Sequence, residues 1–100
     1  MYRPNFRTVV TRTVNEKMIV SYVFTKFVTD CLHRFSNNDW GDICEEDKQA
    51  NDLSWKESKN VLASYTAYPD ADFDKIWITS GKAIEGSEDV VVTVLFPDEY

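Results

Sequence analysis

The chain has 100 residues, of which 43% are hydrophobic and 14% aromatic, and its net charge is −6. This length and composition predict a single domain over residues 1–100 with one packed core, and they argue against intrinsic disorder. The apolar runs are far shorter than the ~18 residues of a transmembrane helix, so no membrane contact is expected. The first residues lack the apolar segment of a secretory signal, which makes a cytoplasmic location the expectation.

The charge is distributed unevenly along the chain. Residues 1–35 hold six basic and two acidic side chains, whereas residues 36–100 hold five basic and fifteen acidic ones. Direct binding to duplex nucleic acid is disfavoured, because it needs a cationic surface. A protein partner with a basic surface fits better, as does mimicry of nucleic acid by carboxylates. The alternative is that the charge only keeps a small protein soluble.

The first part of the chain predicts a strand followed by a long helix. Residues 6–12 are rich in β-branched side chains, which favours a short strand. Thr13 and Glu16 have the spacing of a capping box, and a helix is expected from Val14 to Phe35. Its core face is a stripe of apolar side chains at helical spacing. The members of this stripe are Val20, Phe24, Phe27, Val28, Cys31 and Phe35.

A second helix is expected from Ile43 to Glu57. Asp42 and Glu45 form another capping pattern, and acidic side chains in a first turn favour a helix start through the helix dipole. In this register Asp47 falls on the inner face of the helix, between Ile43 and Ala50.

Three strands follow, at Val61–Tyr68, Lys75–Thr79 and Val90–Phe96. Their short connections favour antiparallel neighbours. The expected fold is therefore α+β, with two helices packed on an antiparallel sheet of three to four strands in the order β-α-α-β-β-β. The second face of this sheet is more apolar than a solvated face requires, which predicts cover by the amino-terminal strand region, a helix or a partner. It carries Leu62, Trp77, Val91 and Leu95.

The segment Asn37–Asp52, NNDWGDICEEDKQAND, is the most distinctive part of the chain. It holds six acidic side chains and one base around a single tryptophan. A tryptophan before a helix often serves as a hydrophobic staple, but a tryptophan flanked by charge is also typical of a binding hot spot. We therefore predict a partner-binding site in this segment. Its candidate residues are Asp39, Trp40, Asp42, Glu45, Glu46 and Asp47.

The sequence lacks the usual signatures of catalysis, so an ordinary enzyme is disfavoured and no catalytic residue, metal ligand or cofactor is predicted. His33 has no Ser or Cys partner at a suggestive spacing, and Cys31, His33 and Cys44 do not have zinc-site spacing. The thiol of Cys44 lies among acids that oppose a thiolate, and Cys31 lies on the apolar stripe. The alternative is a carboxylate- or metal-dependent hydrolase or nuclease-associated protein, in which the acids of the segment would converge on a divalent cation.

The segment Asp39–Asp52, together with VLASY (Val61–Tyr65), KIWIT (Lys75–Thr79) and VTVLFPDEY (Val92–Tyr100), resembles a family of small bacterial proteins. These are carried largely on plasmids, phages and other mobile elements, and some are labelled plasmid-related or type I restriction subunits. Members often have an acidic–Asp–Arg turn before the last strand, whereas this chain has the longer Ser80–Asp89 there, without the Arg. The resemblance implies the genomic context of a mobile element and a fold, but no mechanism. The acidic segment predicts a small non-enzymatic module that binds another protein, and in the mobile-element context the expected role is modulation of host defence, such as restriction or CRISPR machinery.

Overall fold

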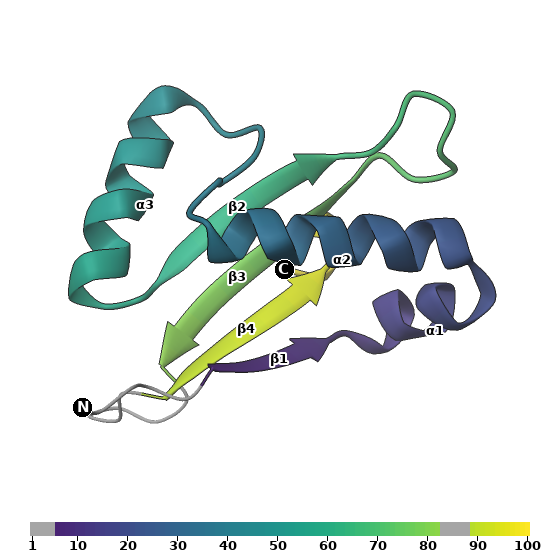
Figure 1. The fold of residues 1–100 in the computed structure, drawn as a ribbon, viewed down its shortest axis with the longest axis horizontal. Coiled ribbons are helices and arrows are strands. Elements are labelled where there is room, and N and C mark those ends of the chain that lie inside the picture. The colour runs from purple at the N-terminus through teal and green to yellow at the C-terminus, as the bar shows by residue number, and fades with distance from the viewer. Residues whose placement is uncertain (1–5, 83–88) are drawn as a thin grey trace.

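The computed structural model of the protein describes residues 6–82 and 89–100. Over these residues the chain forms three α-helices and one four-stranded sheet, so the predicted α+β class is confirmed (Figure 1). The elements in chain order are β1 (Phe6–Val10), α1 (Arg12–Val20), α2 (Tyr22–Ser36), α3 (Glu45–Glu57), β2 (Val61–Thr66), β3 (Lys75–Lys82), β4 (Val90–Leu95) and a short 3-10 helix, η1 (Pro97–Glu99).

The sheet has the strand order β1-β4-β3-β2. Strands β2, β3 and β4 form the predicted antiparallel meander, with Ala63 opposite Ile78 and Ile78 opposite Val94. The expectation of an entirely antiparallel sheet is wrong, because β1 pairs with β4 in parallel. Short connections determine direction only for consecutive strands. The chain between β1 and β4 passes through all three α-helices and the other two strands, so no local pattern indicates how these two strands pair.

The predicted single helix over Val14–Phe35 is two helices that meet at Ser21. The backbone of Ser21 is extended, and its hydroxyl oxygen accepts a hydrogen bond from the Phe24 amide, which caps the start of α2. The cap of α1 also differs from the prediction, since Thr11 rather than Thr13 accepts the bond from the Val14 amide. The break changes the direction of the chain, so Val20 leaves the predicted core stripe and its side chain is 83% exposed.

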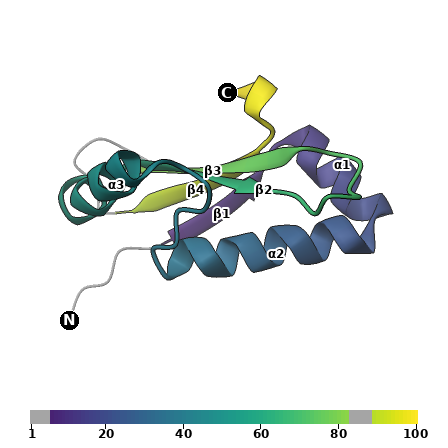
Figure 2. The same ribbon diagram turned by 90° about the horizontal axis from the view of Figure 1, so that it is seen from above.

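Helix α2 lies across one face of the sheet (Figure 2). The other members of the predicted stripe are buried there, against strand side chains that point to the same face. Phe24 makes ring contacts with Phe73 and Phe96, at centroid distances of 4.9 and 5.8 Å. The strand side of this core consists of Val61, Ala63, Tyr65, Ile76, Ile78, Val90, Val92 and Val94.

The second face of the sheet is covered differently. Leu95 is buried, whereas Leu62, Trp77 and Val91 are half-buried. After η1 the chain brings Tyr100 onto Trp77, with ring centroids 5.5 Å apart. No helix of the described residues has the length and apolar character that crossing a membrane requires. Of the predicted turn Ser80–Asp89, residues 83–88 lie outside the described chain.

Candidate partner-binding site

The loop between α2 and α3 runs along the outer edge of β2 and forms a short parallel bridge from Gly41 to Ser64. The Asp42 amide donates to the Ser64 carbonyl over 2.7 Å, and the Ser64 amide donates to the Trp40 carbonyl over 3.3 Å. Gly41 has a positive φ of 79°, and an added Cβ would lie 2.0 Å from the Ser64 carbonyl oxygen. Only glycine permits so close an approach. The loop therefore covers an edge that would otherwise expose unpaired backbone groups.

Asp39 holds the beginning of this loop. Its carboxylate accepts hydrogen bonds from Arg34, with a shorter distance of 2.8 Å, and from the Gly41 amide. The hydrogen bond from Arg34 is the main cause that lowers the pKa of Asp39. The Arg34 guanidinium also lies 4.9 Å from the ring centroid of Tyr65, whose hydroxyl donates to the Asp39 carbonyl. Asp39 therefore holds the loop in place through these hydrogen bonds.

Asp42 also stabilises the loop, through a contact at the end of β2. Its carboxylate accepts a hydrogen bond of 2.7 Å from the Thr66 amide. This hydrogen bond is the main cause that lowers the pKa of Asp42. The predicted capping role is therefore wrong. Cys44 is the residue that precedes α3, and its side chain makes no capping hydrogen bond.

Trp40 is a core residue, with only 2% of its surface exposed. Its indole Nε1 donates to Asp52 Oδ1 on α3 over 2.8 Å, and its ring lies 5.3 Å from that of Phe35. The prediction of Trp40 as an exposed anchor is wrong in this structure, because a partner could not reach the side chain. Trp40 has a structural role instead: it links the loop, α2 and α3.

Glu45, Glu46 and Asp47 form the first turn of α3, and all three side chains are exposed. Among the described residues, no salt bridge involves any of them. The inward orientation predicted for Asp47 is wrong. The helix begins two residues later than predicted and turns its less exposed side chains, which include Asn51 and Trp55, toward the body of the protein. We call Glu45, Glu46 and Asp47 the acidic turn.

Helix α3 contains no buried residue and is held by a few specific contacts. Asp52 receives the Trp40 hydrogen bond, and the Asn51 amide donates to the Leu62 carbonyl over 2.9 Å. The Trp55 ring lies 6.0 Å from that of Phe35. Sequence reasoning missed Asn51, Asp52 and Arg34 as supports of the site, because each partner lies in another element and no periodic signal connects them.

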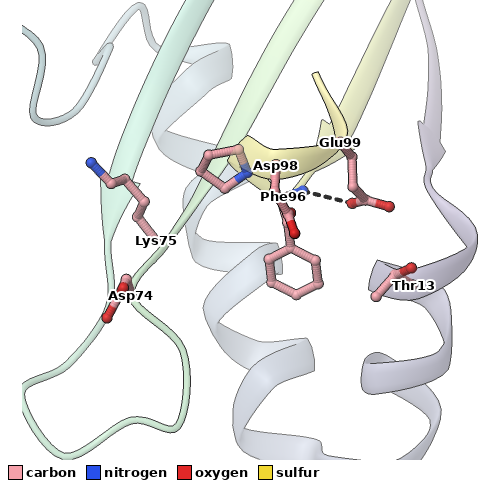
Figure 3. A pocket seen from close by; sticks show the side chains of 7 residues that line it. Thr13, Asp74, Lys75, Phe96, Asp98 and Glu99 are labelled. Atoms are coloured by element: carbon pink, nitrogen blue, oxygen red, sulfur yellow. Dashed lines mark hydrogen bonds between the residues drawn. The ribbon is translucent and has the colours of Figure 1, made fainter.

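A second group of acids, which the sequence analysis did not single out, lies near the same end of β2 as Asp42, because Lys75 pairs with Thr66. A cavity of 420 Å³ there is lined by Thr13, Asp74, Lys75, Phe96, Pro97, Asp98 and Glu99. Figure 3 shows the Glu99 carboxylate accepting the Phe96 amide, over 2.8 Å. The same oxygen accepts the Thr11 hydroxyl. Glu99 therefore fixes η1 against the start of α1.

The two cysteines differ in their exposure. Cys31 is buried, as predicted, and burial raises the pKa of its thiol to about 12. Cys44 is exposed. The metal-dependent alternative requires acids of the loop and α3 to converge. Within residues 6–82 and 89–100, no three His, Cys, Asp or Glu side chains are grouped closely enough to hold a metal ion.

Comparison of the chain with known proteins finds no matching family model, no matching curated protein and no matching solved structure. The resemblance to small proteins of mobile elements therefore stays a prediction from the motifs quoted above.

Proposed function

We propose that this protein is a non-enzymatic binding module that contacts a basic surface of a partner protein through the acidic turn. The observation that carries this proposal is the exposure of Glu45, Glu46 and Asp47 without a salt bridge among the described residues. Asp39, by contrast, is already paired within the protein. A basic side chain of a partner could pair with these three acids without breaking an ion pair within the described protein.

The position of the acidic turn also supports a recognition role. Its three carboxylates lie on consecutive residues of one helical turn, and the loop before it is fixed by Asp39, Gly41 and Asp42. A rigid support reduces the conformational entropy that is lost on binding. Complementary charges also increase the association rate and suppress partners of the same sign.

In the context implied by the resemblance to mobile-element proteins, we propose that the partner belongs to host defence, such as restriction or CRISPR machinery. Such machinery carries basic surfaces that bind nucleic acid, and carboxylates could occupy them in place of phosphates. Asp39 and Asp42 then act as supports of the contact surface, and Trp40 as part of the core beneath it.

The test is capture of the partner from a host lysate by the wild type and by two matched double variants. Glu45→Lys with Glu46→Lys should abolish capture. Asp70→Lys with Asp74→Lys changes the net charge by the same amount on the β2–β3 loop and should leave capture intact. Glu45→Gln with Glu46→Gln removes the negative charge without placing positive charge at the start of α3, where it would oppose the helix dipole. Loss of capture in this variant as well would therefore not be explained by unfolding of α3.

Salt provides the second readout. Capture should weaken steeply as the ionic strength rises, because contacts between exposed charges are screened over about 10 Å at 0.1 M salt. Equal capture by all variants, or capture that does not depend on salt, would remove the acidic turn from the interface.

A further inference from the structure

The junction of α1 and α2 exposes four large apolar side chains within five residues. Ile19 is 74% exposed, Val20 83%, Tyr22 81% and Val23 62%, and only Ser21 lies between them in sequence. We call these four residues the apolar corner. None of them belongs to the core. Packing of the monomer therefore does not explain why this position is apolar.

Patches of this kind on a folded protein mark contact sites. The apolar corner lies at one end of the long dimension of the molecule, whereas α3 lies at the other end (Figure 1). It is thus separate from the acidic turn, and a contact at one surface leaves the other accessible.

The charges around the apolar corner nearly cancel. Residues 12–30 hold three bases and two acids, although the whole chain has a net charge of −6. Arg12 pairs with Glu16 and Lys26 with Asp30, each one helical turn apart. Lys17 pairs with Asp72 of the β2–β3 loop over 2.8 Å. Two copies of the protein repel each other over most of their surface, but this repulsion is smallest where the apolar corners meet.

We propose that the apolar corner is the contact between two copies of this chain in a two-fold dimer. An apolar surface is complementary to itself, as a two-fold contact requires, whereas an acidic surface is not. Side chains of these sizes expose on the order of 400 Å² per copy, so the contact buries roughly 800 Å² before its polar rim, which is below the ~1,200 Å² at which stable specific interfaces begin and corresponds to a weak, transient contact. The dimer is therefore weak and reversible, and it carries one acidic turn at each end.

Sedimentation equilibrium of the full chain over about 10 µM to 1 mM tests this proposal across the range of weak association. The average mass of the wild type should rise from that of one chain, 11.6 kDa, toward twice that value and level off there. Val20→Ser with Tyr22→Ser removes apolar surface without changing the charge and should abolish the rise. Leu53→Ser, at a 60% exposed position on α3, is the matched control and should sediment as the wild type does.

Added salt should leave the dimer unchanged or strengthen it, because it screens the repulsion between the two acidic copies. This response is opposite to that expected for a basic partner, so failure of one proposal is distinguishable from failure of the other. A wild type that stays at the mass of one chain would overturn the proposal. So would equal association of the Val20→Ser/Tyr22→Ser variant, or a mass that rises past two chains without levelling. Binding of the monomer to phosphatidylcholine vesicles would instead assign the corner to a lipid surface.

Discussion

Helices α2 and α3 both pack beside the same sheet, but they are held in opposite ways. Helix α2 buries five side chains, among them Phe24, Phe27 and Phe35, whereas α3 buries none. Apolar burial stabilises in proportion to area and needs no exact geometry. Helix α3 places only the partly buried Trp55 against the core, so it depends more on single contacts such as the hydrogen bond from Trp40 to Asp52. The difference indicates that α2 builds the scaffold and that α3 is a peripheral helix whose outer surface is free to carry charge.

The largest expected effect on stability comes from truncating a buried side chain of α2, because this leaves a cavity in the core. Phe24 is 1% exposed and contacts Phe73 and Phe96, so Phe24→Ala should lower the free energy of unfolding by about 3–5 kcal/mol. Denaturant titration measures this value. Val23→Ala, one residue away but 62% exposed, should change it by less than about 0.5 kcal/mol. Similar losses in both variants would refute the assignment of α2 to the core.

A smaller effect is expected at α3. Asp52→Ala leaves the buried indole N–H of Trp40 without its acceptor, which should cost about 1–3 kcal/mol. Hydrogen exchange should show faster opening of the α3 amides, while the α2 amides change little. Asp52→Asn keeps an acceptor oxygen and should retain most of the stability. If α2 and α3 open together in Asp52→Ala, the two helices form one cooperative unit and the comparison fails.

The smallest expected effect is the change in the free energy of unfolding with pH. The pKa values of Asp39 and Asp42 are lowered in the folded protein, chiefly by hydrogen bonds from Arg34 and from the Thr66 amide. Because the folded protein prefers the charged carboxylates, their contribution is present above their ordinary pKa of 3.8 and is lost as the pH falls through the lowered values. The free energy of unfolding should therefore fall below about pH 4.

Denaturant titrations at several acidic pH values check this prediction. In the double variant Asp39→Asn with Asp42→Asn, the loss of stability toward low pH should be shallower than in the wild type. It should not vanish, because Lys17 also lowers the pKa of Asp72. An identical pH profile in the variant would show that the loop carboxylates are not coupled to folding.

The contrast between α2 and α3 also explains how much of the structure could be predicted from the sequence. The side chains of α2 from Phe24 to Phe35 recur at helical spacing, and the alternating residues of β2, β3 and β4 mark the buried face of the sheet. Both signals are local and both are confirmed. The break at Ser21 was missed because the apolar stripe continues across it in sequence, although a hydroxyl there can cap a new helix.

The candidate site was harder to predict, because its geometry depends on partners far apart in sequence. The bond from Thr66 to Asp42 and the bond from Trp40 to Asp52 join different elements. A tryptophan among charges has the same local pattern whether it is exposed or buried, and only the fold decides. The exposure of Glu45 and Glu46 agrees with the acidic composition of their turn. The inward orientation predicted for Asp47 failed because the less exposed side of α3 carries Lys48, Asn51 and Trp55, one residue later along the helix than predicted.

The most direct test of the central claim, that the acidic turn is the surface for a basic partner, is an NMR titration of the wild type with a lysine-rich peptide. The amides of Glu45, Glu46 and Asp47 should show the largest chemical-shift changes, and Glu45→Gln with Glu46→Gln should remove them. The largest changes at Asp70–Asp74 or at Asp98–Glu99 instead, or equal changes in the variant, would contradict the claim.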